Sequence, residues 1–150
     1  EKNFFMFQAL KLEKKAAFLG DIPVGAVVVS QGEIVGRGWN QCVKLNDPSA
    51  HAEIIALRNA SKHISNYRLL GHQIYVTLEP CCMCLGAIIN ARISCLIYSA
   101  KQPKTGAVVS RFKLLSKNQF NHEVYVDKGC MENKSVSLLR SFFLKRRIKN

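Results

Sequence analysis

Apolar residues recur along the chain at two spacings, and each spacing predicts a kind of secondary structure. From Phe4 to Leu19 they form a stripe three or four residues apart, with Glu13 and its charged neighbours on the opposite, solvent-facing side, which predicts an amphipathic helix. β-branched residues dominate from Ile22 to Ser30, Gln31-Gly32 is typical of a tight turn, and Glu33 to Trp39 alternates with glycines. These two segments therefore predict a β-hairpin.

The rest of the chain alternates helices and strands. Asn46-Asp47-Pro48-Ser49 joins residues favoured at helix N-caps to a proline suited to a first helical turn, so a helix is expected to begin near Ala50. Strands alternating with helices predict a layered α/β fold with helices on both faces of the sheet. The further predicted elements are helices at 50–62, 80–90 and 135–149, strands at 73–78, 93–98 and 123–126, and a basic loop at 101–121.

Composition narrows the class of protein. A chain of 150 residues, 48% of them hydrophobic, can bury a proper core, so we expect one domain over residues 1–150 and exclude wholesale disorder. No apolar run is long enough to span a bilayer. The 22 Lys and Arg against 10 Asp and Glu leave a net charge of +12, which favours a polyanionic partner. Nucleic acid is the first candidate, an anionic membrane surface the second, and a merely soluble basic surface the third.

Six cysteines are present, and three of them fall within residues 81–84. No secretory signal supports a disulfide framework, so metal binding or redox chemistry in a reducing compartment is the better interpretation. We therefore expect a cytoplasmic protein.

Two short motifs carry the chemistry, and each begins a predicted helix. His51-Ala52-Glu53 opens one, and Pro80-Cys81-Cys82-Met83-Cys84 opens the other directly after a strand. Cys81 and Cys84 are three residues apart, so both can bind one ion, and the helix dipole at an N-terminus favours thiolates. One imidazole and two thiolates leave a tetrahedral position free for water, which is the pattern of a catalytic zinc site.

Glu53 completes this hypothesis as the general base and acid. It lies two residues after His51, so its carboxylate need not be a ligand and can take a proton from a water activated by the metal. Three alternatives remain open. Cys81 and Cys84 also fit a thiol–disulfide redox motif, Cys82 or His72 could close a structural zinc site, and His51 could be an ordinary core or capping histidine.

The paired motifs resemble those of zinc-dependent nucleobase deaminases, the cytidine deaminase-like superfamily. Other segments are similar to the bacterial tRNA-specific adenosine deaminases within it, and the likeness covers nearly the whole chain. These segments are Asp21 to Ala26, Gly38-Trp39-Asn40, Asp47 to Glu53, Asn66 to Leu69, Tyr75 to Cys81, Met83-Cys84, Lys104-Thr105-Gly106, Phe142-Phe143 and Arg146-Arg147.

The resemblance implies a three-layer α/β/α sandwich with a five-stranded mixed sheet, a homodimer, and one zinc ion per subunit. It implies hydrolysis of adenosine to inosine at the wobble position of a tRNA anticodon, with arginine tRNA as the main substrate. His51, Cys81 and Cys84 would hold the zinc, and Glu53 would move protons. Substrate contacts are implied for Val24, Asn40, the Ala52 backbone, Lys104, Phe143 and Arg146.

One departure from the family pattern and several alternatives stay open. Gln102 stands where many members carry an aspartate, which bears on the contacts to neighbouring nucleotides. Asn40 could cap a turn, and the basic end of the last helix could be a solvated face. Of the two adjacent phenylalanines we expect Phe142 in the core and Phe143 nearer the site. The rival functions are a free-base or nucleotide deaminase acting on guanine or cytosine, and a zinc-stabilised RNA-binding module without activity.

Overall fold

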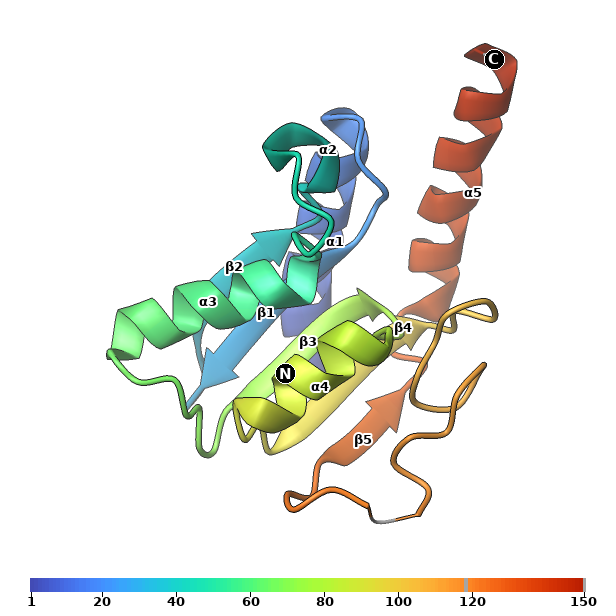
Figure 1. The fold of residues 1–150 in the computed structure, drawn as a ribbon. Helices are drawn as coiled ribbons and strands as arrows, with labels where there is room; N and C mark the ends of the chain where they lie inside the picture. The colour runs from blue at the N-terminus through green and yellow to red at the C-terminus, as the bar shows by residue number, and fades with distance from the viewer. Residues whose placement is uncertain (118, 150) are drawn as a thin grey trace.

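The computed structural model describes residues 1–117 and 119–149 (Figure 1). Five helices and five strands follow one another along this part of the chain. In chain order they are α1 (Lys2–Phe18), β1 (Gly25–Ser30), β2 (Glu33–Trp39), α2 (Cys42–Leu45), α3 (Ala52–Ile64), β3 (Gln73–Leu78), α4 (Cys82–Asn90), β4 (Cys95–Ala100), β5 (Tyr125–Lys128) and α5 (Glu132–Lys149).

The strands form one mixed sheet in the order β2-β1-β3-β4-β5. β1 is antiparallel to β2, which confirms the predicted hairpin, and is also antiparallel to β3. β3, β4 and β5 run parallel. Parallel neighbours need a crossover, which α4 provides between β3 and β4. This confirms the predicted five-stranded mixed sheet.

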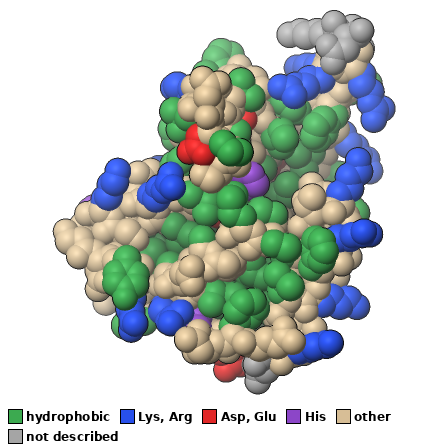
Figure 2. All heavy atoms as spheres, viewed as in Figure 1, with side chains coloured by type: hydrophobic (Ala, Val, Ile, Leu, Met, Phe, Trp, Pro, Cys, Tyr) green, Lys and Arg blue, Asp and Glu red, His purple; other side chains and the backbone are tan. Residues whose placement is uncertain are grey.

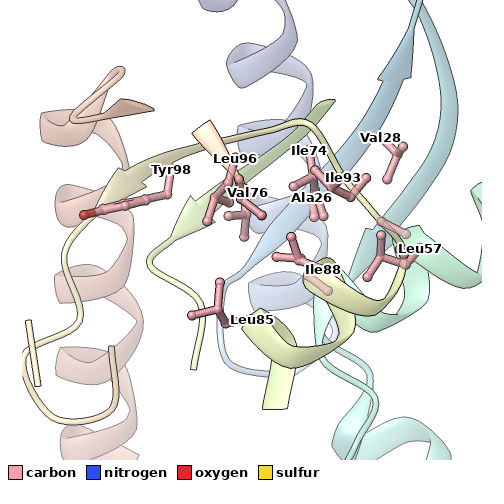
Figure 3. Close-up of a cluster of buried hydrophobic side chains, with 14 of the residues drawn as sticks. Ala26, Val28, Leu57, Ile74, Val76, Leu85, Ile88, Ile93, Leu96 and Tyr98 are labelled. Atoms are coloured by element: carbon pink, nitrogen blue, oxygen red, sulfur yellow. The ribbon is translucent and has the colours of Figure 1, made fainter. Parts of the chain in front are cut away.

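Helices cover both faces of the sheet, which confirms the three-layer α/β/α arrangement (Figure 1). Alternate residues of a strand point to opposite faces, and the two faces bury different clusters. Val28, Ile74 and Leu96 pack against α3 and α4, as Figure 3 shows for this larger cluster. Val27 and Ile97 point the other way and pack with Phe5 and its neighbours on α1.

Two glycines of β2 let α3 lie unusually close to the sheet. A Cβ atom built on Gly38 would lie 2.2 Å from the Ala52 carbonyl oxygen, and one on Gly36 would lie 2.4 Å from the Ala56 oxygen. Both distances are far below van der Waals contact, so no other residue fits there without moving the helix. The beginning of α3, where the predicted site residues lie, is therefore fixed by backbone packing.

Glu13 departs from its predicted place on the solvent-facing side of α1, because α5 packs over that side. Its side chain is fully buried, and Oε2 accepts a hydrogen bond of 2.9 Å from the Ser135 hydroxyl of α5. The same hydroxyl lies 2.9 Å from the Thr77 carbonyl oxygen on β3. The Ser135 hydroxyl of α5 thus joins the Glu13 carboxyl of α1 to the backbone of β3, which the spacing of apolar residues on α1 alone does not indicate.

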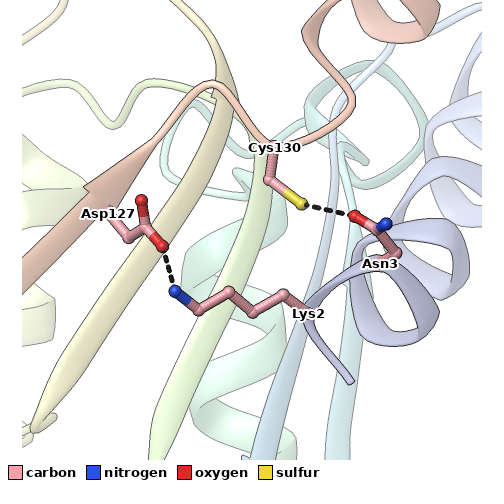
Figure 4. A network of polar contacts seen from close by, with 4 residues as sticks. All are labelled: Lys2, Asn3, Asp127 and Cys130. Atoms are coloured by element: carbon pink, nitrogen blue, oxygen red, sulfur yellow. Dashed lines mark hydrogen bonds and ion pairs between the residues drawn. The ribbon is translucent and has the colours of Figure 1, made fainter.

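The start of α1 is also tied to the last strand (Figure 4). Lys2 forms an ion pair with Asp127 of β5, and the Cys130 thiol donates a hydrogen bond of 3.4 Å to the Asn3 side-chain oxygen. Lys2 is exposed, so the ion pair contributes little to stability. Its effect is to align the N-terminal turn with the edge of the sheet.

Several predicted boundaries were wrong by two or three residues, and each has a local reason. α3 begins at Ala52 rather than Ala50, because the Asp47 carboxylate accepts bonds from the Ser49 N–H and hydroxyl in a tight turn. β4 begins at Cys95 rather than residue 93, because the Ile93 N–H bonds to the end of α4. The short helix α2 was not predicted. No helix of the described residues is long and apolar enough to cross a membrane.

Candidate active site

The two predicted motifs meet near the C-terminal end of the central strand β3. His51 is the N-cap residue of α3, and Cys81 is the N-cap residue of α4, directly after β3. Both helices begin on the side that faces α5 (Figure 1). The sequence therefore places an imidazole and a thiol at two neighbouring helix N-termini, where the helix dipole favours the negative charge of a thiolate.

Three side chains form a cluster with metal-ligand character. The His51, Cys81 and Cys84 ligand atoms all lie within 4.8 Å of one another. The His51 Nδ1 atom is 3.6 Å from the Cys81 sulfur and 3.4 Å from the Cys84 sulfur. Zinc–sulfur bonds of about 2.3 Å and a zinc–nitrogen bond of about 2.0 Å at a tetrahedral angle separate sulfur from nitrogen by about 3.5 Å. The donor set and its spacing therefore fit one tetrahedral zinc ion.

No fourth ligand closes the cluster among the residues that the structure describes. Cys82 is exposed and does not belong to the group, and the His72 ring Nδ1 lies 2.9 Å from the Leu70 carbonyl oxygen before β3 begins. The closed structural site considered from the sequence is thus not formed by these two residues. Three ligands match the composition of a catalytic site, which keeps one position for water or substrate.

The thiols influence each other's ionisation. The pKa of Cys81 is lowered to about 4, first because the Cys84 thiol hydrogen-bonds to its thiolate and second because His51 does the same. The pKa of Cys84 is raised by that shared hydrogen bond and by burial. The pKa of His51 is raised by its hydrogen bond to Cys81. The low pKa of Cys81 favours its thiolate, which is the form that binds a metal ion.

Glu53 lies in the first turn of α3 with only 4% of its surface exposed. Burial disfavours its charged form and raises its pKa to about 7. It is not one of the three clustered ligands. A carboxyl group with a pKa near neutrality, next to a metal-binding cluster, suits proton transfer.

The residues predicted to contact the base lie around the start of α3. The Asn40 side-chain oxygen accepts a hydrogen bond of 2.8 Å from the Ala52 N–H, so the two candidates are bonded to each other. The Asn40 N–H donates to the carbonyl oxygen of Val24, which lies buried just before β1. Asn40 therefore satisfies the first N–H of α3 rather than capping a turn, while its amide nitrogen has no bond to the described residues. Contact of these three residues with a substrate stays a prediction.

The other predicted contacts line a groove of about 890 Å³ between α5 and the loop after β4. Lys104 lies on the loop, and Phe143 and Arg146 lie on α5. Phe143 is 43% exposed and lines the groove. Phe142 is half-buried with the Arg146 guanidinium over its ring, so the prediction that it lies in the core was wrong. Figure 2 shows Lys and Arg side chains following α5. The groove is lined by five basic side chains, Lys101, Lys104, Arg140, Arg146 and Arg147, and by no acidic one among the described residues.

Glu79 is a residue whose role the sequence did not indicate. It belongs to a segment quoted for the family likeness, but spacing alone says nothing of its partners. In the structure it is buried, and its carboxylate accepts hydrogen bonds from the loop after β4. The feature of the sequence that could have indicated a role for Glu79 is its position between a predicted strand and the Pro80-Cys81 pair.

Comparison with known proteins separates the remaining alternatives. Residues 1–100 match the family model of the cytidine and deoxycytidylate deaminase zinc-binding region, which includes all three clustered ligands. The tRNA-specific adenosine deaminase of Haemophilus influenzae is 50% identical over 143 residues, covering 95% of this chain and 83% of that protein. The chain belongs to the tRNA-specific adenosine deaminases. The zinc-binding character predicted from the motifs is thereby confirmed, and the redox alternative falls away.

Solved structures agree with this membership. One solved structure has a TM-score of 0.87 and 41% identity, and the match covers 90% of this chain and 98% of that chain. It comes from biochemical and structural studies of A-to-I editing by tRNA:A34 deaminases at the wobble position of transfer RNA. A guanine deaminase from Bacillus subtilis is also 41% identical, but it covers only 65% of this chain and 63% of its own, with a TM-score of 0.63. The likeness to tRNA-specific adenosine deaminases thus covers 90% or more of this chain, whereas the guanine deaminase matches 65% of it.

Proposed function

We propose that this deaminase converts adenosine to inosine by hydrolysis at the wobble position of a tRNA anticodon loop. The observation that carries the proposal is the joint presence of the His51, Cys81 and Cys84 cluster, a buried carboxyl group beside it, and a basic groove. A guanine or cytosine deaminase needs the cluster and the carboxyl group but has no use for the groove.

The three clustered side chains would hold the zinc ion, His51 through Nδ1 and the two cysteines as thiolates. When bound, zinc supplies a Lewis acid that lowers the pKa of water from about 15.7 to about 7, which makes hydroxide available at neutral pH. The N-cap positions of His51 and Cys81 place both residues at the first turns of α3 and α4.

Glu53 carries the protons of the reaction. It takes one from the attacking water and delivers it to N1 of the adenine as the oxygen bonds to C6. It then moves the second proton from the new hydroxyl to the amino group, which leaves as ammonia when the C6–N bond breaks. A buried carboxyl with a pKa near 7 can accept and release a proton at physiological pH.

The substrate base has to leave its stack to reach this cluster, and an anticodon loop presents unstacked bases at low cost. We assign Val24 to packing on the base and the Asn40 amide to its polar edge, with the Ala52 backbone holding Asn40 in place. Lys104 and Arg146 would bind the neighbouring phosphates or riboses, and Phe143 offers a flat side chain for stacking.

The proposed function is tested by supplying substrates side by side. The zinc-loaded protein is incubated with an anticodon stem-loop carrying a wobble adenosine, with free adenosine, with guanine and with cytidine, and inosine and ammonia are measured. Inosine in the stem-loop alone is expected. Turnover of guanine or cytidine without RNA would indicate the free-base or nucleotide deaminase, and RNA binding without any turnover would indicate an RNA-binding module.

We also propose that the deaminase works as a homodimer through the face of the sheet that α3 and α4 cover. An apolar groove of about 520 Å³ lies between these helices, lined among others by Ile54, Leu57 and Ala87. Figure 2 shows hydrophobic side chains gathered over this region. Exposed apolar surface of this kind is a common mark of a protein interface.

Sedimentation equilibrium tests the dimer. The wild-type chain is expected to have twice the mass of one chain, and Ala87→Arg, which places a charge in the groove, is expected to shift it to the monomer. Ala17→Arg, on α1 and so on the other face, is the matched control. A monomeric wild type, or an unaffected Ala87→Arg dimer, would contradict the interface.

The proposed substrate also indicates where the enzyme works. A tRNA-modifying enzyme of this kind belongs in the cytoplasm, where tRNA and a reducing environment occur together.

We also propose that residues 1–150 form one domain, since α5 packs on α1 and β4 and completes the groove with the loop.

A further inference from the structure

Glu79 lies between the metal-binding cluster and the loop that follows β4. It comes two residues before Cys81, at the end of β3, and only 2% of its surface is exposed. Its own N–H donates to the Ala100 carbonyl oxygen at the end of β4, so its backbone is fixed by the sheet. The side chain points away from solvent, and what it contacts is the loop.

Both carboxylate oxygens accept hydrogen bonds from this loop. Oε2 accepts from three successive backbone N–H groups, those of Val108 at 3.1 Å, Val109 at 2.8 Å and Ser110 at 3.1 Å. Oε1 accepts from the Gln102 N–H at 3.2 Å and from the Ser110 hydroxyl. Successive N–H groups that converge on one anion form a nest, a strong mode of anion binding. One buried carboxylate therefore holds both ends of the segment 102–110.

The loop is also packed directly on this carboxylate. A Cβ atom built on Gly106 would lie 2.5 Å from the Glu79 carboxyl carbon and 2.6 Å from the Gln102 carbonyl oxygen. The Ala107 N–H donates to the Pro80 carbonyl oxygen at 2.9 Å. The loop thus has no room to move toward the sheet and is bonded to the residues on both sides of the Glu79–Pro80 peptide.

The outer side of the same loop faces the basic groove. Lys104 and Gln102 line it opposite Phe143 and Arg146. The Gln102 side-chain oxygen accepts a hydrogen bond of 3.2 Å from the Lys104 N–H, which orders the turn that presents the lysine. Glu79 on the inner side and Lys104 on the outer side are therefore parts of one ordered segment.

We propose that Glu79 is a positioning residue for RNA: it sets the place of the Lys104 loop relative to Cys81, and so aligns the groove with the metal-binding cluster. This inference rests on the proposed function. Glu79 acts through the loop and not on the reacting base, because both of its oxygens are occupied by loop donors.

The variant Glu79→Gln tests the role with little change of shape. Whichever way the amide is oriented, its NH₂ group meets at least two of the donors that now face a carboxylate oxygen. We expect trypsin to cut the loop between residues 101 and 111 faster, and KM for the stem-loop to rise about tenfold, as for a lost hydrogen bond to a charged group. Zinc content is expected to stay full, with kcat within about threefold.

Combining Glu79→Gln with Lys104→Ala separates positioning from general support of the fold. If Glu79 acts by placing Lys104, removing the lysine should cost less in the Glu79→Gln background than in the wild type. Ser110→Ala, which removes a single donor to Oε1, is a milder second variant with the same expected direction. Glu123→Gln, an exposed glutamate outside this network, is the matched control.

Three results would overturn the positioning role. The first is an unchanged rate of loop cleavage in Glu79→Gln, and the second is independent, additive effects of the two substitutions on KM. The third is a loss of zinc together with kcat, because Glu79 would then support Cys81 instead of the loop. Failure of the wild type to form inosine in the stem-loop would refute the proposed function, while the proteolysis result would still report on the loop.

Discussion

Glu53 has the most specific chemical role in the proposal, because it only transfers protons and binds neither the metal nor the RNA. Glu53→Gln keeps the size of the side chain and removes the titrating group. We therefore expect the rate of inosine formation to fall by about 10²–10⁴-fold. Zinc content and RNA affinity should stay near the wild-type values, since Glu53 is outside the ligand cluster. Single-turnover assays with the stem-loop, metal analysis and RNA titration measure the three quantities, with the exposed Glu33→Gln as control.

A substitution at Cys84 tests the ligand cluster by removing a metal ligand instead of the proton-transferring group. It is completely buried, and its sulfur lies 3.4 Å from His51 Nδ1, so Cys84→Ala removes one of three ligands. We expect the purified variant to contain little zinc and to melt at a lower temperature, because metal binding and folding are coupled. Cys82→Ala, two residues away and exposed, should keep both properties. A full zinc complement in Cys84→Ala would refute the ligand assignment.

Among the elements, α5 depends on a buried acid that is not part of the active site. Glu13 on α1 is bonded to Ser135 on α5, and burial raises its pKa to about 7 from an unfolded value of 4.5. Between these pH values the folded chain holds a proton that the unfolded chain has released. The free energy of unfolding should therefore fall by roughly 3 kcal/mol as the pH rises from about 4.5 to about 7, and this contribution stays lost above that range.

Glu13→Gln isolates this contribution, because glutamine is neutral at every pH and retains one acceptor oxygen. The measurement is urea unfolding of both proteins from pH 5 to pH 8. Relative to the wild type, the variant should gain stability as the pH rises, and the difference between the two curves should level off above pH 7. Parallel curves would mean that Glu13 titrates alike in the folded and unfolded chains.

Glu13 also marks the limit of what sequence patterns predicted among the elements. The order and type of the long elements followed from apolar spacing, and β3 was predicted to the residue, since a strand between turn residues is a local feature. The burial of Glu13 depends on α5, more than 100 residues away in the chain. Long-range packing of this kind leaves no local signal.

The same distinction holds for the site. His51, Cys81, Cys84 and Glu53 were predictable because each motif needs only a few neighbouring residues, and the structure brings them together. The bond between Asn40 and Ala52 and the nest around Glu79 join segments far apart in the chain, so spacing could not reveal them. Chemistry was therefore easier to predict than the contacts that position it.

At the scale of the whole molecule, charge is the feature that separates an RNA-directed deaminase from one that acts on free bases. The chain carries a net charge of +12, and five of its basic side chains line the groove between α5 and the loop after β4. Phosphates bound by such side chains release counterions, so affinity falls as salt rises. A small-molecule deaminase of the same superfamily would bind a neutral base without this dependence.

We therefore expect the affinity for an anticodon stem-loop to fall steeply with salt, with a log–log slope of about −0.7 for every phosphate contacted in the single-stranded loop. Arg146→Ala should reduce that slope by about one such contact, because Arg146 lines the groove. Arg37→Ala, on the strand at the far edge of the sheet, should leave it unchanged. Fluorescence anisotropy between low and physiological salt gives both slopes. A flat response in the wild type would favour a small-molecule substrate, and equal effects of the two substitutions would show that net charge, rather than this groove, holds the RNA.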